Sequence, residues 1–174
     1  KKCMTVRINS VSLIFMSLPA PFSQPEAENA LRQWEELAKT QDDAALGAWM
    51  LEALRGAQKP LLLAVFGNSP YLTQLLLSHP GVLRQIETQG LETAHARILG
   101  SLTGQMDESD GKTFMAGLRQ AKNKLALLVA LADIAGLWPL EQVTAALSGF
   151  AELCLTHSVN HLLAAAARRG EITL

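Results

Sequence analysis

The spacing of apolar residues predicts a chain built almost entirely of helices. The clearest stripe advances in alternating steps of four and three residues, which is the repeat of one helix face. Its members are Phe114, Leu118, Ala121, Leu125, Leu128, Ala132 and Ala135. Gly136 then ends this helix, and Pro139 opens a second long one that Gly170 terminates. Because the connection is short, we expect the two helices to form an antiparallel pair.

The second helix of this pair is also predicted to carry one apolar line. Its members are Val143, Leu147, Phe150, Cys154 and Leu162. A helix with a single apolar stripe usually packs that stripe on a neighbour. We therefore expect this line to face the preceding helix.

Shorter helices are predicted before residue 104, each bounded by a cap or a breaker. Ser23 caps a helix that runs to about Lys39, and Asp42 or Asp43 caps another that runs to about Gln58. The apolar face of the latter consists of Leu46, Trp49, Met50, Ala53 and Leu54. Pro60, Ser69-Pro70 and His79-Pro80-Gly81 then start or break short helices, and residues 91–102 form another.

The polar segment 104–111 is predicted to be a loop, with Ser109 or Asp110 capping the next helix. The tetrapeptide 110–113, Asp-Gly-Lys-Thr, contains the Gly-Lys-Thr of a phosphate-binding loop. The rest of that motif is missing, because six residues rather than four separate Gly104 from Gly111 and no strand precedes them. We interpret the match as accidental.

Composition narrows the function classes. The chain has 174 residues, of which 49% are hydrophobic and 18% charged, with a net charge of −1. This composition allows a substantial hydrophobic core. The net charge is too small to attract nucleic acid or an anionic membrane electrostatically. No apolar stretch is long enough to span a membrane. Cys3 and Cys154 are far apart and predict no disulfide, which fits a reducing cytoplasm.

The N-terminal segment imitates a signal peptide without completing one. A basic start precedes the apolar run 11–16, but no small-x-small cleavage site precedes Ala20. A translation start at Met16 is the simpler interpretation. We therefore predict that residues 1–22 are a disordered or non-native tail and that residues 23–174 form the helical unit.

Two groups of side chains are candidates for chemistry. Cys154, His157 and His161 share one side of the last helix and could hold a soft metal ion, although packing against the preceding helix explains them better. The basic residues Arg119, Lys122 and Lys124 could contact an acidic partner or a nucleotide, but they also suit a solvated helix face. Carboxylates near helix starts are explained by capping, and Trp34, Trp49 and Trp138 by anchoring helix contacts.

Two stretches are distinctive, namely residues 66–76, FGNSPYLTQLL, and residues 119–148, RQAKNKLALLVALADIAGLWPLEQVTAALS. Both resemble the N-terminal helical region of bacterial glutamine synthetase adenylyltransferase. The resemblance extends over about residues 16–174. It implies a bifunctional enzyme that attaches AMP from ATP to glutamine synthetase and removes it by phosphorolysis, with Mg²⁺ as metal. The implied partners are glutamine synthetase and a PII-type regulatory protein.

The metal-binding motif of that family is missing from this sequence. The family's catalytic core carries Asp-x-Asp after a glycine-rich turn. No two aspartates here stand two positions apart, and the nearest miss is Asp107 with Asp110, three positions apart. We therefore assign no catalytic, cofactor-binding or metal-binding residue and expect neither ATP nor Mg²⁺ on this chain. The expected fold is an all-α part of an enzyme whose α/β core lies elsewhere. The alternative is a stand-alone helical interaction module.

Overall fold

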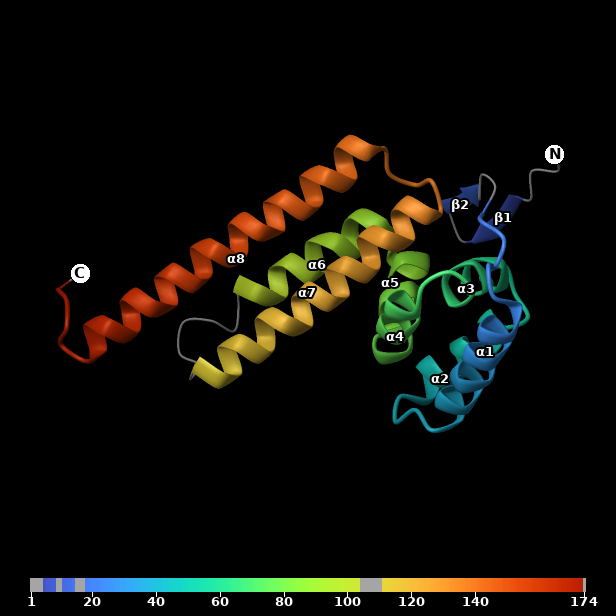
Figure 1. Ribbon diagram of the computed structural model, residues 1–174, viewed down its shortest axis with the longest axis horizontal. Coiled ribbons are helices and arrows are strands. Elements are labelled where there is room, and N and C mark those ends of the chain that lie inside the picture. The colour runs from blue at the N-terminus through green and yellow to red at the C-terminus, as the bar shows by residue number, and fades with distance from the viewer. Residues whose placement is uncertain (1–4, 9–10, 15–17, 104–110, 174) are drawn as a thin grey trace.

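The computed structural model describes residues 5–8, 11–14, 18–103 and 111–173, and within these ranges it confirms the all-α fold class (Figure 1). The helices are α1 (Gln24–Lys39), α2 (Ala44–Ala53), α3 (Lys59–Phe66), α4 (Pro70–Ser78), α5 (Pro80–Gln89), α6 (Leu91–Thr103), α7 (Gly111–Ile134) and α8 (Leu140–Arg168). Helices α1–α5 form a compact group, and α6 extends from it side by side with the two longer helices α7 and α8.

A short hairpin precedes the helices and departs from the expectation that strands would be absent. Strands β1 (Thr5–Ile8) and β2 (Val11–Ile14) pair antiparallel, with Val6 opposite Leu13. Both segments are rich in β-branched residues, which favour strands, whereas the rest of the chain is rich in Leu and Ala. That residues 1–22 are a disordered or non-native tail stays a prediction.

The predicted caps explain where several helices begin. Ser23 Oγ accepts the amide of Glu26 at 3.4 Å, and Asp43 Oδ1 accepts two amides of α2 at 2.9 and 3.1 Å. Ser69 caps α4 in the same way. The candidate caps Ser109 and Asp110 lie outside the described residues.

Helix α2 is shorter than predicted, because it ends at Ala53 and not near Gln58. Glycine is a poor helix former, and the chain turns at Gly56, whose carbonyl accepts the amide of Lys59 at 3.4 Å. This turn lets α3 start immediately before Pro60.

The Gly67-Asn68 break joins the segment before α1 to the end of α3. The side chain of Asn68 donates to the carbonyl of Ala20 at 3.0 Å and accepts the amide of Phe22 at 3.2 Å. A Cβ atom on Gly67 would collide with Pro21. Gly67 and Asn68 therefore fix the position of residues 20–22, which belong to the predicted tail.

Trp34 lies at the centre of the α1–α3 group. It is fully buried, and its indole N–H donates to the carbonyl of Met50 at 2.9 Å. Its ring contacts the rings of Trp49 and Phe66, with centroid distances of 6.3 and 6.1 Å. This one side chain thus joins α1, α2 and α3, as predicted for the tryptophans.

The predicted antiparallel pair of α7 and α8 is confirmed. Gly136 adopts a positive φ of 65°, and the amide of Leu137 bonds back to the carbonyl of Ala132 at 2.8 Å, which caps α7. Within this connection, the Trp138 indole donates to Glu92 Oε1 of α6 at 2.9 Å, and the Gln142 side chain of α8 donates to the same oxygen at 2.8 Å. The carboxylate of Glu92 therefore ties α6 to the α7–α8 connection and to the start of α8.

Candidate functional site

Two of the three candidate metal ligands on α8, Cys154 and His161, pack against neighbouring residues as predicted, and His157 is half-buried. The His161 ring stacks on Phe114 of α7, with centroids 4.1 Å apart and planes 9° apart. Cys154 is half-buried against the core, and burial raises the pKa of its thiol. Among the described residues, no three His, Cys, Asp or Glu side chains gather so that they could hold a metal ion.

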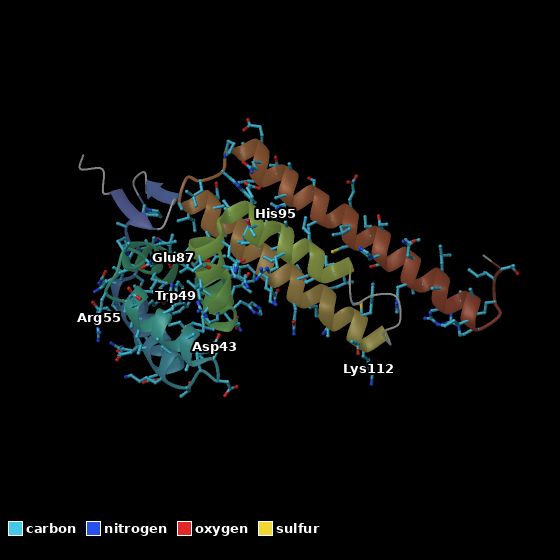
Figure 2. The ribbon with its side chains drawn as sticks, turned by 180° about the vertical axis from the view of Figure 1, so that it is seen from behind. Asp43, Trp49, Arg55, Glu87, His95 and Lys112 are labelled. Atoms are coloured by element: carbon cyan, nitrogen blue, oxygen red, sulfur yellow. The ribbon has the colours of Figure 1, made fainter. Side chains whose placement is uncertain are left out.

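The basic candidates of α7 do not form one site. Lys112 lies at the exposed start of the helix, away from the other labelled side chains in Figure 2, and Arg119 and Lys122 are exposed as well. Lys124 differs from them, because it is half-buried and lines a cleft. Asp107 and Asp110 lie outside the described residues.

This cleft, the junction cleft, lies where the compact group meets the long helices. It has a volume of about 580 Å³. Its lining comes from the end of α1, the start of α2, the α4–α5 junction, α6 and α7: Leu37, Gln41, Leu46, Leu77, Ser78, His79, Pro80, Gly81, Val82, Gln85, Arg97, Ile98, Ser101 and Lys124. Sequence reasoning missed it, because its residues come from segments that only the packing of α6 and α7 brings together.

The outer face of α8 is a second candidate surface, and it corrects the prediction of a single apolar line. Val143, Phe150 and Cys154 turn toward the core, but the predicted members Leu147 and Leu162 do not. Five exposed apolar residues form a separate line beside the packed one, which we call the outer face: Leu147, Ala151, Leu155, Val159 and Leu162.

The exposure of this outer face is large. Leu155 is 67% exposed, Val159 52% and Leu162 65%. A helix whose apolar surface is wider than the stripe that it packs on its neighbours is typical of a helix that further structure covers. Only the layer formed by α6 and α7 is present among the described residues, so the outer face is available to a partner.

A half-buried carboxylate joins α5 to the compact group. Glu87 accepts hydrogen bonds from the indole of Trp49 and the side chain of Gln58, each at 2.7 Å. Figure 2 shows Trp49 and Glu87 close together. Burial is the main cause that raises the pKa of Glu87 above its usual 4.5, with the negative charge of Glu52 adding to it and the Trp49 hydrogen bond opposing it.

This raised pKa predicts a measurable dependence of stability on pH. The folded state holds the Glu87 proton more tightly than the unfolded state, so the stability that this group contributes is present below pH 4.5 and is lost as pH rises through the folded pKa. We expect the free energy of unfolding of the native chain, relative to Glu87→Gln, to fall as pH is raised through that window. Urea unfolding of both proteins from pH 4 to pH 7 measures this, and parallel pH profiles would contradict the expectation.

No solved structure is significantly similar to the chain. A family model does match. The model described as glutamate-ammonia ligase adenylyltransferase covers residues 60–173, which include all of α4–α8 and both stretches that carried the resemblance.

The chain belongs to the glutamate-ammonia ligase adenylyltransferase family.

Three curated relatives agree with this assignment, and each is named a bifunctional glutamine synthetase adenylyltransferase/adenylyl-removing enzyme. The protein of Rhizobium meliloti is 32% identical over 88% of this chain, that of Bradyrhizobium sp. strain BTAi1 34% over 91%, and that of Caulobacter vibrioides 33% over 88%. The chain spans only 15–16% of the length of these adenylyltransferases. In the part of the chain that the structure describes, no helix is long and apolar enough to cross a membrane.

Proposed function

We propose that this chain is the helical region of the adenylyl-removing half of the enzyme and that it does not transfer adenylyl groups by itself. The observation that carries the proposal is the family match over residues 60–173. The sequence has no Asp-x-Asp pair, and the described residues offer no group of carboxylates fitted to Mg²⁺. The proposal therefore assigns Mg²⁺ and ATP to other parts of a family-length enzyme.

The proposed role is structural support for deadenylylation of glutamine synthetase in the cytoplasm, with a PII-type protein as regulator. In a family-length enzyme, the outer face of α8 packs against a neighbouring domain of the same chain. Two facts support this occupant. The relatives are about six times as long as this chain, and α8 carries a line of exposed apolar side chains beside the one that packs on the core.

A complementation assay tests this role. The Rhizobium meliloti enzyme, with the segment matching this chain deleted, is mixed with adenylylated glutamine synthetase and phosphate, and AMP removal from glutamine synthetase is followed by mass spectrometry. We expect no removal by the chain alone, little by the deleted enzyme, and recovery when the two are combined.

A pair of matched variants tests the surface. Leu155→Asp with Leu162→Asp places two negative charges on the outer face, whereas Thr156→Asp with Asn160→Asp places two on the exposed polar side of the same helix. We expect only the first pair to abolish recovery. Removal by the chain alone would overturn the proposed inactivity, and equal recovery with both pairs, or none with the native chain, would overturn the docking.

A stand-alone interaction module is the second candidate function, and the exposed outer face favours it as well. It predicts that the native chain binds glutamine synthetase directly and that the deleted enzyme gains nothing from it. Analytical ultracentrifugation of the chain with glutamine synthetase alone separates the two candidates.

A further inference from the structure

The junction cleft has the chemistry of an anion site. Two of its lining side chains are cations, namely Arg97 and Lys124, and no Asp or Glu is among the lining residues. The carboxylate of Asp43, at the start of α2, already bonds to Arg84 at 3.4 Å. Within the described residues, neither Arg97 nor Lys124 has an ion-pair partner.

Lys124 is a half-buried cation that lines the cleft. An ion pair in a partly buried place is screened by salt less than one on the open surface. The charge of Lys124 also reaches His79. Burial is the larger cause that lowers the pKa of His79 below 6.5, and the positive charge of Lys124 is the second cause. Both side chains line the junction cleft.

The backbone adds to the positive potential at this place. The ten-residue helix α5 begins at Pro80, and no described side chain caps its N-terminus. The N-terminus of a helix carries a partial positive charge. A Cβ atom on Gly81 would meet nothing within 4 Å, so the space above this first turn is open to a ligand.

The rest of the lining is suited to an apolar body. Leu37, Leu46, Leu77, Val82 and Ile98 form an apolar wall, and Gln41, Ser78, Gln85 and Ser101 offer polar contacts beside it. A volume of about 580 Å³ lies within the range of small-molecule pockets.

We propose that the junction cleft binds a small phosphorylated molecule, with its phosphate on Lys124 and Arg97 and its body on the apolar wall. A phosphate suits two cations better than a carboxylate does, because it offers more oxygens and more charge. This inference does not rest on the proposed function, since it concerns only residues of this chain.

Isothermal titration of the native chain with three probes tests the proposal. The probes are AMP, inorganic phosphate and adenosine. We expect AMP to bind more tightly than inorganic phosphate, because only AMP also reaches the apolar wall, and we expect no detectable binding of adenosine. Adenosine binding as tightly as AMP would overturn phosphate recognition, and phosphate binding as tightly as AMP would overturn the role of the wall.

Charge-neutralising variants locate the binding. Lys124→Gln and Arg97→Gln should each weaken AMP binding about tenfold or more, which is the size of a lost charge-assisted hydrogen bond. Lys122→Gln is the matched control, because Lys122 is an exposed lysine of the same helix that does not line the cleft. It should change AMP affinity less than about twofold. Equal weakening by all three variants, or no binding of AMP to the native chain, would overturn the proposal. Thermal unfolding of each variant confirms that it is folded.

Discussion

Trp34→Ala is expected to reduce the free energy of unfolding by about 3–5 kcal/mol, the range for removing a buried large aromatic side chain. Trp34 is fully buried and touches the rings of Trp49 and Phe66. The substitution also leaves the carbonyl of Met50 without the indole donor that it has at 2.9 Å. Its effect therefore reaches α1, α2 and α3 together.

Urea unfolding followed by circular dichroism measures this loss. For a domain of this size we also expect the melting temperature to fall by about 10 °C. Trp34→Phe is the control, because it keeps an aromatic ring but removes the N–H donor, and it should lose clearly less than Trp34→Ala. If the Trp34→Ala variant and the native chain unfold at the same urea concentration, the packing described for α1–α3 is wrong.

Leu128→Ala is expected to cost about 2–5 kcal/mol, whereas Leu155→Ala should change stability by no more than about 0.5 kcal/mol. Both are leucines on adjacent long helices, so the chemical change is the same. Leu128 of α7 is fully buried, while Leu155 on the outer face of α8 is 67% exposed.

The same urea titration compares these two variants in parallel. A large loss for both would mean that the outer face is already packed in the chain as it stands, for example between two copies. Sedimentation equilibrium of the native chain and of Leu155→Ala then identifies such an association.

Features fixed by neighbouring residues were predictable from the sequence. Ser23, Asp43 and Ser69 cap helices through their own local amides, and Gly136 adopts the positive φ that a helix end requires. These interactions join residues only a few positions apart, so the local sequence is enough to predict them. The prediction for the end of α2 was less accurate, because the apolar run continues past the turn at Gly56.

Features that depend on long-range packing were not predictable in this way. The apolar residues of α8 occupy two sides, so a search for one stripe combined Phe150 of the packed side with Leu162 of the outer face. The sequence identifies Lys124 as a basic residue, but its neighbours in the sequence do not predict that it lines a cleft together with His79. The role of Glu87 depends on donors 29 and 38 residues away.

The connection between α7 and α8 has a mechanical consequence. Helix α8 has 29 residues, which at 1.5 Å per residue makes it about 43 Å long. Figure 1 shows its C-terminal part projecting past the ends of α6 and α7. A tilt of only about 5° at the turn would move the far end by about 4 Å, as for a rod of that length pivoting at one end. The hydrogen bonds from Trp138 and Gln142 to Glu92 brace the pivot, and the stack of His161 on Phe114 restrains the helix further along.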